Sequence, residues 1–291
     1  MEKQKMKRVG RAALIFIGCL VLLFLIALGV IAGFSRENTT RQVVYFDEKP
    51  KAAGYLVVLA RVISADLNRK TMVVRIEPQP EGTLSADDKV HLLAAPMTLY
   101  INPSPSGQIP TYQAGSLMPT TDVSLDTLGE VEMYAWDSHK ADMRLFAVRP
   151  GADGKQVPVP IQLIFQGTEP GIRLRLHVEK TQASSDVSLS IFATRSTIIR
   201  VVVVFAIVII WLLAATVVVM SILVLRGREL QIGMLTFSAA LLFSIIAFRN
   251  ALPGAPPLGA LMDYIGAFWG YALVTISLVA LTIVWIKHGA D

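Results

Sequence analysis

The residues that could carry acid–base or metal chemistry are few in this chain, and one local cluster stands out. Asp137 and His139 are two residues apart, so in a strand they share a face and could hold a metal ion together. Two ligands are too few for a closed metal site. A structural turn that follows Tyr134-Ala135-Trp136 is the simpler explanation, with Trp136 as a core plug rather than a ligand platform.

The remaining acidic residues and histidines are scattered. General acid–base catalysis needs paired groups in a cleft, and the sequence shows no such pairing. It also contains no phosphate-binding glycine loop, His-Glu-x-x-His motif, nucleophile elbow or calcium loop. We therefore expect no catalytic residue, no metal and no cofactor. The other histidines and the carboxylates considered are His91, His177, His288, Asp87, Asp88, Asp122 and Asp126.

The segment from Arg249 to Asp263 is the most distinctive stretch. Residues 253–259 contain three prolines and two glycines, which favours a compact, non-helical path because proline fixes φ and glycine permits positive φ. Arg249 and Asp263 are expected to pair and close the loop. A docking platform joining two parts of the protein is favoured over a binding role. The candidate binding residues are Arg249, Pro253, Gly254, Pro256, Pro257, Gly259 and Asp263, together with Trp136 and Asp137.

Four apolar stretches are long enough to cross a membrane. A helix rises about 1.5 Å per residue, so about 20 apolar residues cross the hydrocarbon. None of the stretches contains Asp, Glu, Lys, Arg or His, which argues against a proton-coupled carrier. The stretches are Ala12–Ser35, Val201–Leu225, Leu230–Phe248 and Tyr264–Ile286. The first is longer than a typical signal peptide core and is expected to stay as an uncleaved anchor.

Basic residues beside the spans predict the orientation. Five of them precede the first span, so both termini are expected in the cytoplasm of a multi-pass protein of the cell membrane, with residues 37–199 outside. Residues 37–195 hold 16 Lys+Arg and 18 Asp+Glu, a net charge of −2. The sequence pI of about 9.3 therefore reflects the membrane flanks and does not indicate nucleic-acid binding.

The segment between the first two spans has the period of β-strands. Apolar residues alternate with polar ones in 172–179, 187–191, 159–165, 143–147 and 72–76, and further strands are expected at 55–65, 89–94, 97–102, 121–126 and 130–135. Short strands separated by turn signals, such as Pro78 to Gly82, favour an antiparallel β-sandwich. Residues 103–120 are expected to form a long exposed loop. The single cysteine, Cys19, excludes an intrachain disulfide.

The predicted architecture is thus a membrane protein of mixed α+β class. Residues 1–36 form a basic tail and a transmembrane anchor, residues 37–199 an extracytoplasmic β-sandwich, and residues 200–291 a bundle of three transmembrane helices with a short cytoplasmic tail.

The loop pattern Arg-Asn-x-x-Pro-Gly-x-Pro-Pro-x-Gly followed by Asp, here Arg249 to Asp263, together with this layout resembles domain-of-unknown-function family 4436, a group of bacterial and fungal membrane proteins. Members often carry a Tyr-Pro-Phe-Asp-like signature in the β domain. Tyr134-Ala135-Trp136-Asp137 stands there, with Ala for Pro and Trp for Phe. The family has no assigned activity, so the resemblance implies an architecture and no substrate.

Three functions are weighed. The first is a non-enzymatic envelope protein whose β domain binds a ligand or a partner protein outside the cell. The second is an accessory subunit of a transporter, channel or larger membrane complex, and the third is a membrane enzyme. The expected partners are the lipid bilayer and a membrane protein or second copy reached through the helices, and nucleic acid is not among them. Gly29-x-x-x-Gly33 and Gly266-x-x-x-Gly270 allow close helix approach, within one chain or with a partner helix.

Overall fold

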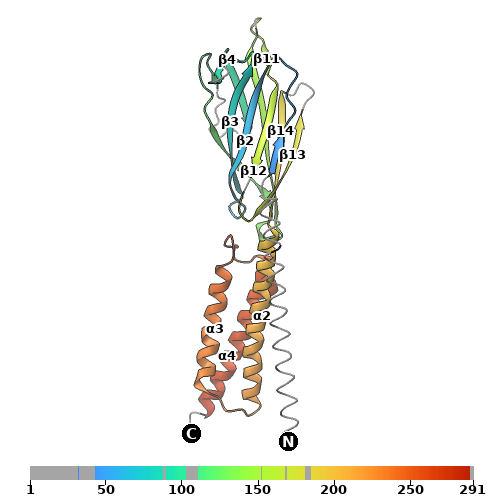
Figure 1. The fold of residues 1–291 in the computed structure, drawn as a ribbon. Coiled ribbons are helices and arrows are strands. Elements are labelled where there is room, and N and C mark those ends of the chain that lie inside the picture. Colours follow the sequence, from blue (N-terminus) through green and yellow to red (C-terminus); the bar gives the residue numbers. More distant parts are fainter. Residues whose placement is uncertain are drawn as a thin grey trace. The chain divides into compact units, whose positions relative to one another are not determined.

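The computed structural model of the protein describes residue 32 and residues 43–87, 90–102, 111–151, 153–167, 169–180 and 185–288 (Figure 1). The predicted anchor Ala12–Ser35 lies outside the described residues apart from Ala32, as does the rest of the tail-and-anchor segment 1–36. The predicted loop 103–120 is described only from Thr111, and within that part Tyr112 and Met118 are buried.

Two sheets make up the β domain, which we define as the described residues between 43 and 195. The first sheet has the order β1 (Val43–Phe46), β12 (Ile161–Gly167), β2 (Gly54–Asp66), β3 (Thr71–Gly82) and β8 (Thr121–Asp126). The second has the order β13 (Ile172–Lys180), β14 (Asp186–Arg195), β10 (Ser138–Pro150), β6 (Met97–Asn102) and β7 (Thr111–Tyr112), with β9 (Leu128–Gly129) and β11 (Gln156–Pro158) also paired to β10. A small ribbon joins β4 (Ser85–Asp87) to β5 (Leu92–Leu93).

One strand pair departs from the predicted antiparallel arrangement. Strand β12 lies between β1 and β2, and it runs antiparallel to β1 but parallel to β2, with Ile161 in register with Leu56. The prediction of an antiparallel sandwich was therefore wrong for this pair. Alternation of apolar residues reveals which face of a strand is buried, but it does not reveal the strand's neighbour or direction.

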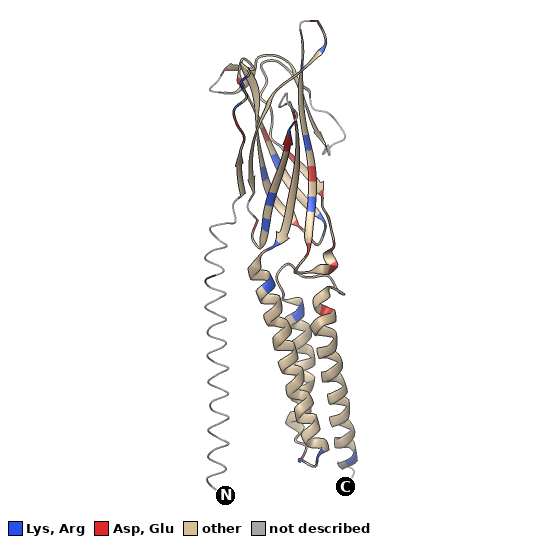
Figure 2. Ribbon diagram, turned by 90° about the vertical axis from the view of Figure 1, so that its right-hand side faces the viewer, with Lys and Arg blue, Asp and Glu red and all other residues tan. Residues whose placement is uncertain are grey.

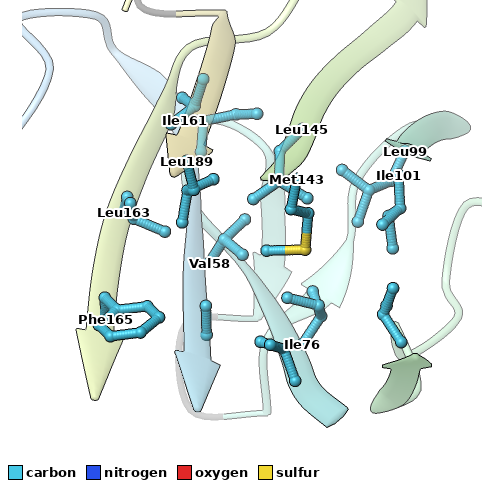
Figure 3. Packing of buried hydrophobic residues seen from close by; sticks show 14 of the residues in the cluster. Val58, Ile76, Leu99, Ile101, Met143, Leu145, Ile161, Leu163, Phe165 and Leu189 are labelled. Atoms are coloured by element: carbon cyan, nitrogen blue, oxygen red, sulfur yellow. The ribbon is translucent and has the colours of Figure 1, made fainter. Parts of the chain in front are cut away.

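The two sheets enclose one apolar core. Each long strand turns alternate side chains inward, as the period of two requires. Val58, Ile76 and Phe165 come from the first sheet and meet Met143 and Leu189 from the second (Figure 3). Full burial of one such side chain contributes about 1.5–3 kcal/mol to folding, so this core provides the stability that disulfides would otherwise supply.

Most of the predicted strands are present, and two local predictions were wrong. Residues 130–135 do not form a strand. Val131–Met133 form a short 3₁₀ helix, η1, and the following Tyr134 packs away from the sheets. The segment Pro78 to Gly82 is not a turn but the end of β3. Strand β8 pairs only with Thr71–Ile76, so the prolines lie where β3 is an edge and needs no donor on that side.

Three helices follow, and among the described residues these are the helices long and apolar enough to cross a membrane. They are α2 (Thr197–Leu225), α3 (Ile232–Asn250) and α4 (Phe268–His288), which is preceded by a π-helical turn, η2 (Asp263–Ala267). Ser196 caps α2 by accepting a hydrogen bond from the backbone N–H of Ile199 at 3.3 Å. The chain is therefore of mixed α+β class, with three helices that could span a membrane.

Small residues bring α2 and α4 together. A Cβ added to Gly266 would lie 3.2 Å from Ile207, and one added to Gly270 would lie 2.5 Å from Ile210, both on α2. The Gly266-x-x-x-Gly270 pattern is thus used for packing within this chain. Gly29-x-x-x-Gly33 lies outside the described residues apart from Ala32.

Charged side chains are confined to the ends of the helices (Figure 2). The sequence between Arg200 and Arg226 on α2 contains none, and neither does α3 before Arg249. Arg226 and Arg228 lie in the turn between α2 and α3. A charge-free stretch of this length suits the hydrocarbon of a bilayer.

Candidate functional site

A buried polar cluster lies at the start of β10. Its inward-facing positions continue backward from Met143 through Ala141 to His139, so the imidazole is buried. His139 Nε2 lies 3.2 Å from Asp137 Oδ2, and its Nδ1 lies 3.3 Å from the hydroxyl of Thr127. Gly129 is in register with His139, and a Cβ on it would come 2.5 Å from Nδ1. Glycine is therefore required by the close approach of the ring.

Arg195 joins this cluster from the end of β14. Its Nε donates to both Asp137 carboxylate oxygens, at 2.9 and 3.0 Å, and its Nη2 donates to Asn68 Oδ1 at 2.6 Å. The guanidinium also lies 4.4 Å from the centre of the Tyr134 ring, within range of a cation–π interaction. Burial raises the pKa of Asp137, but the hydrogen bonds from His139 and Arg195 outweigh it and hold the pKa below its ordinary value.

Three side chains form four hydrogen bonds between the β domain and the helical region. The Tyr134 hydroxyl donates to the carbonyl of Pro253 at 2.5 Å, and Asn68 Nδ2 donates to the carbonyls of Gly254 and Ala255. Burial raises the pKa of Tyr134 to about 12, so the hydroxyl keeps its proton. In the first turn of α2, Arg200 Nε donates to the carbonyl of Ala135 at 3.3 Å. We call Asn68, Tyr134, Asp137, His139, Arg195, Arg200 and these loop carbonyls the junction network.

The two residues that follow η1 pack against the helical region as an apolar plug. Tyr134 and Ala135, both fully buried, pack with Val203 and Ala206 of α2. Leu252, Ala260 and Met262 complete the same cluster. Packing and hydrogen bonding therefore act at the same place.

A second arginine–aspartate pair closes the loop between α3 and η2. Arg249 Nε and Nη2 donate to the two Asp263 oxygens at 2.9 and 2.6 Å, which confirms the predicted pairing. The same guanidinium donates to the carbonyls of Pro256 and Pro257, at 3.0 and 2.7 Å. Asp263 also accepts from the backbone N–H of Gly259 at 2.9 Å. We call residues 251–262 the proline loop and this arrangement the loop clip.

The predicted candidate residues fall into two groups. Arg249, Pro256, Pro257, Gly259 and Asp263 meet in the loop clip, whereas Pro253, Gly254 and Asp137 belong to the junction network or contact it. Trp136 is 40% exposed, so its interpretation as a core plug was wrong, and Tyr134 fills that position. In the part of the chain that the structure describes, no three His, Cys, Asp or Glu side chains are placed to hold a metal ion.

Sequence reasoning missed Asn68, Tyr134 and Arg195. The sequence did contain a signal for Arg195. Every second residue of β14 faces inward, namely Val187, Leu189, Ile191 and Ala193, and Arg195 is the next in this series. A buried charge is costly unless it is paired, so this position predicts a partner for Arg195. Tyr134 lies in the segment that resembles the family signature, but nothing in that segment distinguished it as a contact residue. Asn68 carried no signal beyond its place in a turn.

A cleft of about 960 Å³ opens beside the junction network. Four segments line it: residues 64–69, residues 169–172, residues 195, 196, 198 and 199, and residues 253–255. The cleft thus has walls from the ends of both sheets, from the first turn of α2 and from the proline loop.

Two family models match the chain. One, described as domain of unknown function DUF4436, matches residues 46–191, and another, described as domain of unknown function DUF8686, matches residues 195–288. Comparison with curated proteins finds no match. Tyr134–Asp137 falls in the first matched region and Arg249–Asp263 in the second, so the segments that suggested the resemblance belong to different models. The first match spans half of the chain, and this protein belongs to the DUF4436 family.

Proposed function

We propose that the protein is a non-enzymatic, multi-pass envelope protein that holds a β-sandwich binding module outside the cytoplasm at a fixed orientation to the membrane. The observation that carries this proposal is the junction network. A module tethered only by its chain ends would turn freely, whereas this one is attached to the proline loop through Tyr134 and Asn68 and to α2 through Arg200.

Burial of the network supports a structural role for the attachment. The side chains of Asp137 and His139 are 0% exposed and that of Arg195 is 5% exposed. Breaking a buried pair on one side leaves an uncompensated charge, so each partner strongly favours the assembled arrangement. An enzyme built on Asp137 and His139 would need these groups open to substrate, and here they are covered and engaged with each other.

The placement of charge supports the orientation. Arg226 and Arg228 lie at the end of the helices that the positive-inside rule assigns to the cytoplasm. The β domain joins the opposite end, at Thr197. It therefore belongs on the outer side, where its alternating polar face is solvated.

Cysteine labelling tests the orientation. The single native Cys19 is replaced with serine, and either Lys155→Cys in the β domain or Arg228→Cys in the α2–α3 turn is introduced, both at exposed positions. In intact cells a membrane-impermeant maleimide should label the cysteine at 155 and should reach the one at 228 only after permeabilisation. The reverse pattern would overturn the orientation.

The binding role is tested on the full-length protein purified in mild detergent. Mass spectrometry of the intact complex should reveal a bound small molecule or partner that is retained by the wild type. Loss of this species from a variant in the β domain, but not from a matched variant in the α2–α3 turn, is the expected result. A protein that carries nothing from any membrane preparation would contradict the proposal.

A further inference from the structure

The cleft beside the junction network has the dimensions of a small-molecule site. Its volume of about 960 Å³ is within the usual range for ligand pockets, about 300–1,000 Å³. Its walls come from the β domain and from the helical region, so a bound ligand would contact both. The structure thus provides a preformed recess beside the junction network.

One carboxylate in the cleft lacks a cationic partner. Asp66 is engaged, because Arg69 Nε lies 3.6 Å from its Oδ2 and its Oδ1 accepts from the backbone N–H groups of Asn68 and Arg69 at 3.0 Å. Arg195 is likewise engaged by Asp137 and Asn68. Glu169 is half-buried, and within the described residues it forms no salt bridge, with a hydrogen bond from the backbone of Ala65 as its contact. Burial raises the pKa of Glu169 against the effect of that bond.

The lining of the cleft also includes apolar side chains. Ile198 and Ile199 in the first turn of α2 are partly exposed, and Pro253 of the proline loop is exposed. A partly desolvated carboxylate and apolar side chains that line the same cleft are complementary to a cation that carries a hydrocarbon segment. Ligand sites of this kind combine mostly apolar contact with few polar groups that fix the orientation.

The position of the cleft along α2 predicts that it is accessible from the headgroup layer and from the aqueous phase. Helix α3 has 19 residues, about 28 Å of rise, which matches the hydrocarbon thickness of about 30 Å. Ile207 of α2 packs against Gly266 of η2, two residues before α4 begins. Ile199 lies eight residues earlier, about 12 Å further along the helix away from the membrane, so we expect the cleft to open near the outer edge of the headgroup layer.

We propose that this cleft binds a small molecule that carries an ammonium group and an apolar segment, with the ammonium group paired to the Glu169 carboxylate and the apolar segment against Ile198 and Pro253. The inference rests on the proposed binding role and specifies its ligand. An amine in the aqueous phase and the headgroup of an aminophospholipid share this chemistry, and the experiment separates these sources.

The test uses calorimetric titration of the full-length protein in a nonionic detergent at pH 7.5. Hexylamine is the probe, and hexanoate and hexan-1-ol are controls of equal chain length. We expect hexylamine to bind and the two controls to bind at least tenfold more weakly, on the order of one charge-assisted hydrogen bond. Equal binding of hexanoate would overturn the proposal.

Variants locate the site. Glu169→Gln keeps the shape of the side chain and should weaken hexylamine binding about fivefold to tenfold. Glu48→Gln, at an exposed position outside the cleft, should bind like the wild type. Ile198→Ser changes the apolar lining without altering charge and should weaken binding about threefold or more. Wild-type affinity in both cleft variants would contradict the assignment.

Nanodiscs identify the source of the ammonium group. Phosphatidylethanolamine discs should weaken hexylamine binding relative to phosphatidylglycerol discs if a lipid headgroup occupies the cleft, whereas equal binding in both discs assigns a soluble amine. The cysteine labelling at positions 155 and 228 does not depend on Glu169. Failure of the ligand assignment is therefore distinguishable from failure of the proposed orientation.

Discussion

Two buried arginine–aspartate pairs of this protein have similar geometry but connect different parts of the chain. Arg249 and Asp263 are 14 residues apart and close a single loop. Arg195 and Asp137 are 58 residues apart, and their guanidinium also reaches Asn68 and Tyr134, which contact the proline loop. The first pair therefore fixes the shape of one segment, whereas the second fixes the relation between two parts of the chain.

The difference teaches that sequence separation indicates what a buried ion pair holds together. A local pair can form as soon as its loop folds, because few residues must be ordered. A distant pair forms only when separate elements have already assembled, and its stability is shared with the packing of those elements. Substitutions in the Arg195–Asp137 pair should therefore lower the stability more, and affect more of the protein, than substitutions in the Arg249–Asp263 pair.

The largest effect is expected for Asp137→Ala. It leaves the buried Arg195 guanidinium without its carboxylate, which should lower the free energy of unfolding by about 3–5 kcal/mol. Thermal unfolding of the full-length protein in detergent measures the change. Asp122→Ala, which breaks the exposed pair with Arg75, is the matched control and should change stability little. Similar losses in both variants would show that the junction network is not energetically special.

Asp263→Asn should have a smaller and more local effect. Arg249 keeps the carbonyls of Pro256 and Pro257 as acceptors, so we expect a loss of about 1.5–3 kcal/mol, typical of a charge-assisted hydrogen bond. Hydrogen exchange of residues 251–262 should increase, while exchange in strands β3 and β10 stays unchanged. Faster exchange throughout the β domain would remove the distinction between a local and a joining pair.

Gly254→Ala probes the point where the proline loop meets Arg195. Gly254 has φ +75°, and a Cβ there would lie 2.8 Å from Arg195 Nη1. Positive φ alone costs a non-glycine residue about 1–2 kcal/mol. Gly115→Ala is the control, since Gly115 has the same φ and open space around it. The melting temperature should fall further for Gly254→Ala, and an equal fall would exclude a contribution from Arg195.

Tyr134→Phe removes one hydrogen bond across the junction and keeps the ring that packs on Arg195. The expected loss is about 0.5–1.5 kcal/mol. Spin labels at positions 155 and 228 should report a broader distance distribution in the variant, because the β domain is held at one point fewer. An unchanged distribution would mean that Asn68 and Arg200 suffice to fix the orientation.

The smallest effect concerns pH. Because the pKa of Asp137 is lowered in the folded protein, its contribution to stability is complete above the unfolded pKa of about 3.9 and is lost as the pH falls through the folded value. Stability of the wild type should therefore decline below about pH 4. The Asp137→Asn variant should show a shallower decline in unfolding experiments over the same acid range, and an identical slope would assign the acid sensitivity to other carboxylates.

The sequence predicted the positions of helices and strands better than it predicted which strands pair and in which direction. Alternation located β6 and β8 to the residue, and hydropathy located the three described helices to within about four residues, because periodicity and length follow directly from backbone geometry. The parallel pairing of β12 with β2 left no trace, since the inward face of a strand is the same whichever way its neighbour runs.

Of the two parts of the candidate site, the sequence predicted the loop clip but not the junction network. The loop clip was accessible because its two charged residues flank a proline-rich stretch and are close in sequence. The junction network was not, because Asn68, Tyr134 and Arg195 come from three distant segments. The inward-facing position of Arg195 in β14 predicts that this charge has a partner, but it does not identify which residue that partner is.

The position of β12 between β1 and β2 also sets the order in which the first sheet can be completed. Val43 pairs with Gly167 and Leu56 pairs with Ile161, so both pair with residues that are synthesised more than a hundred positions later. Chains emerge at about 5–20 residues per second, so during synthesis the edges of β1 and β2 stay open for several seconds. A nascent chain of this topology would benefit from a chaperone that shields those edges until β12 arrives.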